Sequence, residues 1–390
     1  MIRTYRSFIA AGAAALLMST SPLAAFDTQA SAAFVLDETT GTVLLAKNAD
    51  TPLPPASMSK LMTLYIAFEA VRDGRLRLEE ELPVSAHANS FGGSTLFLRQ
   101  GERVSVEDLI RGIIVLSGND ACVVLAEALS PDGTEAGFAR MMTQRAQQMG
   151  MTNSVFKNSS GWPADGHVMS MRDLTLLAQR IIEDFPEFYP MFAEEEFLFD
   201  EAESSNRFNR NPLLTLGIGA DGLKTGHTQE AGYGLVGSAK QGDRRVIFTI
   251  TGLDTAQARA QESEAIVNWA FRQFAERTVT RAGAVIAEAD VWMGASASVG
   301  LMAKEDVTLL LPNTPGTSVT AEVVYTGPIE APIAEGRQLA ELIISPEGLP
   351  EHRIPLYAAS AVPASGFVAR MMSVSQVLLG RLQTPAEETM

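Results

Sequence analysis

Two side chains that could form a nucleophile and its base stand three residues apart in PLPPASMSKLMT, residues 52–63: Ser57 and Lys60. A serine hydroxyl needs a base to take its proton, and residues three apart share one face of a helix. The following run, residues 61–71, is apolar on nearly every side and predicts a helix in the middle of a domain. Burial there would disfavour the charged lysine. The structural alternative is that Ser57 only caps the helix.

Two further triplets carry polar side chains that could complete such a site. Ser117-Gly118-Asn119 lies in VLSGND between two apolar helical runs, where the glycine predicts a break that turns both side chains into a cleft. Lys224-Thr225-Gly226 lies in DGLKTGHT at the start of a strand-rich region. Each triplet alone is compatible with a simple turn. All three motifs in this order are a combination that chance seldom produces.

The elements that must position these residues follow a mixed pattern. AAFVLD and TVLLAKN flank the turn ETTG and predict a hairpin, and helices dominate from there to about residue 186. The runs GLKTG, YGLVGSA and RRVIFTITG then predict three strands, followed by the helical segment TAQARAQESEAIVNWAFRQFAE. We therefore expect an α+β domain over residues 26–276, in which strands from both ends form one antiparallel sheet against a helical block. Residues 277–363 read as a small all-β, sandwich-like domain.

Composition excludes several classes of site. The chain has 390 residues and a formal net charge of −16, which argues against binding to nucleic acid. Cys122 is the only cysteine, so no intrachain disulfide can form, and its apolar surroundings predict a buried structural thiol. The four histidines are scattered without metal-ligand spacing, so no metal site is expected. A G-x-S-x-G nucleophile elbow is also absent.

The N-terminus has the pattern of a secretory signal. Arg3 and Arg6 precede an apolar stretch from Phe8 to about Met18, and the small residues of SPLAAFD follow. This predicts a signal peptide over residues 1–25, cleaved near Ala25, and therefore an exported protein. A membrane anchor is the alternative, but the apolar stretch is too short to span a bilayer comfortably.

These motifs resemble those of the low-molecular-mass penicillin-binding proteins, which are D-alanyl-D-alanine carboxypeptidases related to the serine β-lactamases. Besides SMSK, SGN and KTG, the likeness includes LIRGIIVLSGNDACVVLAE, NRNPLL, LKTGHT, the trailing β-domain and the final helix, almost the whole chain. The resemblance implies a β-lactamase/transpeptidase-like fold. It implies removal of the terminal D-alanine from peptidoglycan stem pentapeptides through a Ser57 acyl-enzyme, without a metal or organic cofactor. β-Lactam antibiotics would be covalent inhibitors.

The same resemblance assigns roles to individual residues. The catalytic residues would be Ser57, Lys60 and Ser117, and the oxyanion would lie between the backbone N–H groups of Ser57 and His227. Lys224 would stand beside Lys60 and help to lower its pKa. The expected substrate-binding residues are Asn119, Arg210, Lys224, Thr225 and Gly226.

Other readings of the motifs stay open. A β-lactamase of this fold is less favoured, because the middle residue of SGN is glycine rather than aspartate and the acidic run AEEEFLFDEAE has no asparagine at useful spacing. A DD-endopeptidase and a non-catalytic peptidoglycan-binding protein are further alternatives. Trp162 in SGWP stands where relatives often have a smaller aliphatic residue, which leaves the fine substrate preference open.

The end of the chain predicts an amphipathic helix. Residues 364–390 place an apolar stripe at helical spacing: Phe367, Met371, Val374, Leu378 and Leu382. In the family such a tail lies in the membrane surface, so we expect a periplasmic enzyme attached peripherally to the inner membrane. Docking of this helix on its own protein is the alternative.

Overall fold

The computed structural model describes residues 4–8, 26–203, 205–313 and 319–366. The chain divides into two compact units. One is Phe26–Arg272, and the other contains Gln273–Met390 together with Met1–Ala25. The boundary predicted from the sequence, after residue 276, falls inside strand β9 (Phe274–Thr280).

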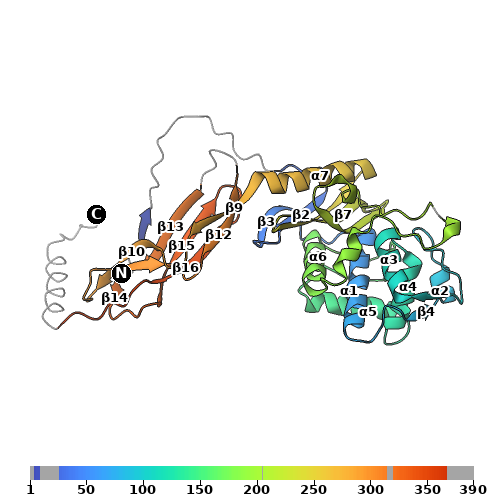
Figure 1. Cartoon of the computed structure of the whole chain (residues 1–390), viewed down its shortest axis with the longest axis horizontal. Helices are drawn as coiled ribbons and strands as arrows, with labels where there is room; N and C mark the ends of the chain where they lie inside the picture. Colours follow the sequence, from blue (N-terminus) through green and yellow to red (C-terminus); the bar gives the residue numbers. More distant parts are fainter. Residues whose placement is uncertain (1–3, 9–25, 204, 314–318, 367–390) are drawn as a thin grey trace, which may run out of the picture. The chain divides into compact units, whose positions relative to one another are not determined.

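The unit Phe26–Arg272 is built on a five-stranded antiparallel sheet (Figure 1). The strand order is β3 (Thr42–Lys47), β2 (Ala32–Asp37), β8 (Arg244–Leu253), β7 (Gly232–Gln241) and β6 (Ala220–Thr228). Pairing of β2 with β8 joins the N-terminal hairpin to the three later strands. The predicted sheet, assembled from both ends of the domain, is therefore confirmed, and β6 forms one of its edges.

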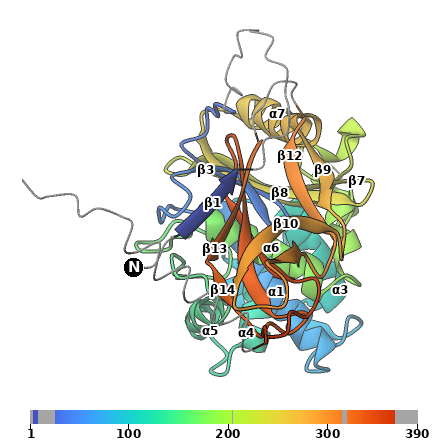
Figure 2. The same ribbon diagram turned by 90° about the vertical axis from the view of Figure 1, so that its left-hand side faces the viewer.

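Helices cover both faces of this sheet. Helix α7 (Ala256–Gln273) lies on one side, and α6 (Met171–Asp184) packs against β2 and β8 on the other (Figures 1 and 2). Below α6 lies the helical block, which contains α1 (Lys60–Arg72), α3 (Val106–Arg111), α4 (Asn119–Leu129) and α5 (Glu135–Gln148). Two of these helices begin with a serine cap at the spacing S-x-x-D: Ser105 Oγ accepts from the Asp108 N–H, and Ser170 Oγ accepts from the Asp173 N–H. Two short strands in this block were not predicted: β4 (Glu81–Pro83) and β5 (Arg103–Ser105).

The start of α1 differs from the expected cap. A 3₁₀ turn, η1 (Ala56–Ser59), precedes the helix, and neither Ser57 nor Ser59 makes a side-chain capping hydrogen bond. Ala56 has a φ of 49°, in the left-handed region that is strained for a residue with a Cβ. The structural reading of Ser57 as a cap is wrong, because its hydroxyl turns toward Lys60 instead.

The unit beginning at Gln273 is an all-β domain, as predicted. One sheet has the order β1 (Thr4–Phe8), β13 (Val319–Thr326), β15 (Gln338–Pro346), β16 (His352–Ala358), β11 (Ser298–Met302), β10 (Val285–Trp292) and β14 (Ile329–Glu330). A second sheet pairs β9 with β12 (Val307–Pro312). Apolar side chains from both sheets share one core, for example Leu309, Leu301 and Leu342. Phe274–Glu276, predicted as helix, begin β9.

The predictions for the two chain ends are not tested. Strand β1 lies within the predicted signal peptide and pairs with β13, and the signal remains a prediction. Residues 367–390, which carry the predicted amphipathic helix, lie outside the described residues. Within the described ranges, no helix has the length and apolar character needed to span a membrane.

Candidate active site

Ser57 and Lys60 meet at the start of α1. Lys60 Nζ lies 2.7 Å from Ser57 Oγ and donates a second hydrogen bond, 2.6 Å long, to the carbonyl oxygen of Ser160. The Lys60 side chain is fully buried, while Ser57 is partly exposed. The predicted serine-lysine pair is therefore in hydrogen-bond contact, and a backbone carbonyl from a segment 100 residues away fixes the amine.

Burial changes the chemistry of both lysines at this site. It lowers the pKa of Lys60 to about 8, with a smaller contribution from the positive charge of Arg210. Lys224 is also buried, and its pKa is lowered well below the usual value by desolvation and then by repulsion from Lys60 and Arg210. The direction predicted for Lys60 is confirmed. Burial and the charge of Arg210 account for the lowered pKa of Lys60, and the predicted contribution from Lys224 is not among the causes. Repulsion between the two amines instead contributes to the lowered pKa of Lys224.

Two glycines allow the segments around Ser57 to approach closely. A Cβ on Gly161 would lie 1.9 Å from the carbonyl oxygen of Ala56, and Gly161 also has a φ of +78°. A Cβ on Gly226 would lie 3.0 Å from the Pro55 carbonyl oxygen and 3.0 Å from Met58 Cγ. The turn that carries Ser57, residues 55–58, therefore packs between the segment containing Gly161 and strand β6. Gly226, predicted as a substrate-binding residue, contributes here through its missing side chain.

The Ser117-Gly118-Asn119 triplet forms the predicted break between two helical segments. Ser117 ends η2 (Gly112–Leu116) with a φ of 64°, and α4 begins at Asn119. The Asn119 amide donates to the carbonyl oxygen of Gly92 at 2.8 Å. Asp120 accepts hydrogen bonds from the N–H groups of Leu96 and Leu98 and so ties down the loop after Gly92.

The remaining predicted residues lie along or beside β6. Lys224 and Thr225 are buried, and Lys224 Nζ donates to the Thr225 carbonyl oxygen at 3.2 Å. Arg210 is exposed and donates to Ser94 Oγ at 2.5 Å. Its guanidinium is near enough to lower the pKa of both lysines. Ser57, Lys60, Lys224 and Arg210 therefore lie in one region of the unit Phe26–Arg272.

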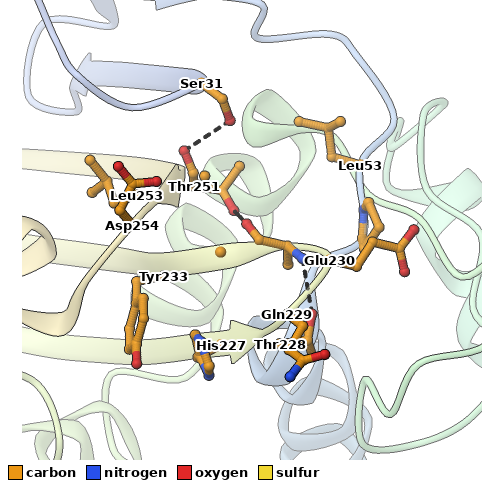
Figure 3. Close-up of a pocket in the computed structure, with 14 residues that line it drawn as sticks. Ser31, Leu53, His227, Thr228, Gln229, Glu230, Tyr233, Thr251, Leu253 and Asp254 are labelled. Atoms are coloured by element: carbon orange, nitrogen blue, oxygen red, sulfur yellow. Dashed lines mark hydrogen bonds between the residues drawn. The ribbon is translucent and has the colours of Figure 1, made fainter.

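His227 has its ring on the surface rather than beside Ser57. The ring packs against that of Tyr233 of β7, tilted by 30° and with centroids 3.8 Å apart, and Figure 3 shows the two side by side. They help to line a cavity of about 550 Å³ whose walls include Leu53, Thr251 and Asp254. The oxyanion role expected for the His227 backbone N–H remains a prediction.

Sequence reasoning missed the network that holds the Ser160 carbonyl. Glu135 Oε1 accepts hydrogen bonds from the N–H and the Oγ of Ser159, at 3.0 and 2.6 Å. Glu135 Oε2 lies 3.1 Å from His87 Nε2. Thr63 of α1 donates to the Ser159 carbonyl oxygen at 2.6 Å. The glycine in SSGWP could have indicated a close approach of this segment to another part of the chain. No residue near it in the sequence indicates Glu135 as the partner.

Two other expectations concern cysteine and metal. Cys122 is fully buried, as predicted, and burial raises the pKa of its thiol to about 12. Among the residues that the structure describes, no three His, Cys, Asp or Glu side chains gather as a metal site.

The comparisons with known proteins agree with this geometry. Residues 18–255 match the model of the D-alanyl-D-alanine carboxypeptidase family, and residues 274–364 match that of the penicillin-binding protein 5 C-terminal domain. D-alanyl-D-alanine carboxypeptidase DacC of Escherichia coli is 34% identical over 345 residues, which are 86% of this chain and 85% of that protein.

Solved structures show the same relationship. Penicillin-binding protein 5 from Haemophilus influenzae superposes with a TM-score of 0.69 at 32% identity, over 89% of this chain and all of that one. Penicillin-binding protein D2 from Listeria monocytogenes, in its ampicillin-bound form, gives 0.57 at 33% identity over 63% of this chain and 99% of its own. This protein therefore belongs to the D-alanyl-D-alanine carboxypeptidase family, with a penicillin-binding-protein fold and a C-terminal β-domain.

Proposed function

We propose that this peptidase removes the terminal D-alanine from peptidoglycan stem peptides through an acyl-enzyme on Ser57. The observation that carries the proposal is the 2.7 Å contact between Ser57 Oγ and a buried Lys60 Nζ with a lowered pKa. Neutral Lys60 takes the hydroxyl proton as Ser57 Oγ attacks the carbonyl carbon of the penultimate D-alanine. The negative oxygen that forms is stabilised by the backbone N–H groups of Ser57 and His227.

Collapse of this intermediate breaks the peptide bond. The departing D-alanine amine takes a proton relayed by Ser117, and the remaining peptide stays on Ser57 as an ester. Water then attacks the ester carbonyl, its proton passes to Lys60, and Ser57 recovers its hydroxyl proton as the peptide leaves. Both steps use Lys60 alternately as acceptor and donor.

Substrate orientation falls to the residues around the edge strand β6. An extended peptide can lie along the free edge of this strand, where main-chain groups supply hydrogen bonds. Lys224, Thr225 and Arg210 are proposed to hold the terminal carboxylate, and Asn119 the peptide amide. Gly226 keeps β6 close to the nucleophile turn.

The surrounding features support a cell-wall setting for this reaction. The signal-like N-terminus supports export to the periplasm, and the pattern of residues 364–390 supports peripheral attachment to the inner membrane. β-Lactams are proposed to acylate Ser57 and to leave slowly, because the aspartate and the glutamate-asparagine loop associated with fast β-lactamase turnover have no counterpart in the sequence motifs.

The test uses a peptide ending in D-Ala-D-Ala, with released D-alanine as the readout. We expect release by the wild type, loss of release after pre-incubation with penicillin, and no release by Ser57→Ala. A fluorescent penicillin should label the wild type but not Ser57→Ala. Rapid multiple-turnover hydrolysis of nitrocefin would instead favour a β-lactamase, and absence of both labelling and release would favour a binding protein.

A further inference from the structure

Ser59 ends the turn η1 and has a buried contact that the proposed mechanism does not use. Its side chain is fully buried, and its Oγ lies 2.8 Å from His167 Nε2. Within the described ranges, Ser59 Oγ has no other hydrogen-bond partner. His167 is also buried, and it forms part of the wall of a cavity of about 280 Å³ beside η1, together with residues such as Asp165 and Glu230. A side-chain contact therefore joins η1 to a residue 108 positions later in the chain.

The second ring nitrogen of His167 shows which group donates in this contact. The Lys157 backbone N–H donates to His167 Nδ1 at 3.3 Å. A neutral imidazole that accepts at Nδ1 carries its proton on Nε2, so Nε2–H donates to Ser59 Oγ. Burial lowers the pKa of His167 to about 4, with smaller contributions from Lys60 and Lys157. The ring is therefore neutral at pH 7 and keeps this tautomer.

The segment 157–168 contacts residues on both sides of the reacting hydroxyl. It lies against Ala56, and one of its carbonyl oxygens accepts the hydrogen bond from Lys60 Nζ. His167 adds a third contact, at Ser59, directly before Lys60 in the chain. Because Ser59 is the last residue before α1, a shift of its backbone would move the start of the helix and the lysine with it.

We propose that His167 is a positioning residue for acylation: it holds Ser59, and Ser59 holds the start of α1 where Lys60 reaches Ser57. The imidazole takes no part in proton transfer, because its Nε2–H points to Ser59 rather than to the reacting hydroxyl. This inference rests on the proposed function, because it concerns the rate at which Ser57 is acylated.

Two substitutions at position 167 separate the two contacts of the ring. A glutamine amide can place its NH₂ group near the position of Nε2 and keep a donor for Ser59. An asparagine amide places its oxygen near the position of Nδ1 and keeps only the acceptor for Lys157. The readout is the acylation rate constant of the full-length protein with a fluorescent penicillin at limiting concentration. We expect His167→Gln to stay within about threefold of the wild type and His167→Asn to lose about tenfold.

A double-mutant cycle tests whether the effect passes through Ser59. Ser59→Ala should also lose about tenfold, and its combination with His167→Asn should lose no more, because both remove the same contact. Independent effects would multiply to about a hundredfold. Calorimetry with a peptide ending in D-Ala-D-Ala, on variants that also carry Ser57→Ala, should give an unchanged Kd, because neither side chain is proposed to touch the substrate.

A matched control separates positioning from loss of stability. Thr175→Val removes another fully buried side-chain hydrogen bond of 2.8 Å, which joins Thr175 of α6 to Thr249 of β8. This variant should lower the temperature of thermal unfolding about as much as His167→Asn does and should keep the wild-type acylation rate.

The other outcomes contradict different parts of the proposal. Normal acylation of His167→Asn and Ser59→Ala overturns the positioning role, as does an equal loss of acylation in Thr175→Val. If His167→Gln is as slow as His167→Asn, or if the effects multiply, the role does not pass through Ser59. A wild-type protein that penicillin does not label overturns the proposed function, and this role with it.

Discussion

On one side of Ser57 the charged groups are buried, and on the other side they are exposed. Lys60 and Lys224 have exposed fractions of 0% and 2%, whereas Asp165 and Glu230 stand at the surface of the neighbouring cavity. Desolvation shifts the pKa of the buried lysines and makes a neutral amine available. Exposed carboxylates contribute modest, salt-dependent attraction. The buried side is therefore suited to proton transfer, whereas charges on the open side are solvated.

The largest expected effect comes from keeping a charge at the buried base. Lys60→Arg should reduce acylation by at least about 10³-fold, because a guanidinium does not release its proton in a protein. Labelling by a fluorescent penicillin measures this. Lys157→Arg, the same exchange at an exposed lysine, is the control and should label normally. Retained labelling of Lys60→Arg would remove Lys60 from the role of base.

The next effect tests the close approach of Gly161 to Ala56, which holds the turn beside Ser57. Gly161→Ala should reduce the acylation rate by about 10²-fold, because its Cβ would displace the Ala56 carbonyl next to the nucleophile. Gly133→Ala is a matched control, since Gly133 has a φ of +69° but no atom within 4 Å of the added Cβ. Gly133→Ala should destabilise folding by about 1 kcal/mol through backbone strain and keep its acylation rate. Equal effects on acylation would refute the steric argument.

The pH dependence should distinguish a buried amine from an exposed one. A base with a pKa of about 8 is mostly protonated at pH 7 and mostly neutral at pH 9. The acylation rate constant at low penicillin concentration should therefore rise about tenfold between these pH values and then level off. A profile that is flat over this range would show that Lys60 does not titrate there.

The smallest expected effect concerns Glu135, which contacts Lys60 only indirectly, through the segment Ser159–Ser160. Glu135→Gln keeps an acceptor for Ser159 but removes the charge that strengthens both hydrogen bonds. Because Ser159 precedes the carbonyl that holds Lys60, we expect a loss of about threefold in acylation with an unchanged Kd for a peptide ending in D-Ala-D-Ala. Glu79→Gln, at an exposed carboxylate, controls for the loss of one charge. A changed Kd with normal acylation would place Glu135 on the substrate side instead.

Much of the framework was predictable because its signals are local. The alternating strands, the caps at Ser105 and Ser170, and the shared helical face of Ser57 and Lys60 all depend on residues a few positions apart. The three motifs and their order were sufficient to indicate the family and the chemistry. The alternative reading of Ser57 as a helix cap is wrong, because its hydroxyl contacts Lys60 and makes no capping hydrogen bond.

The sequence by itself determined which groups could react: a serine, a lysine three residues later, and two further polar triplets. Tertiary structure decided the state of those groups, because desolvation and repulsion arise from residues distant in the chain. Ser160 fixes the Lys60 amine from 100 positions away, and Arg210 adds its charge from a separate loop. Residues 161–168 also meet the end of β6 only in the folded chain, where they form the cavity beside Ser57. These contacts have no local periodicity, so no pattern in the sequence predicts them.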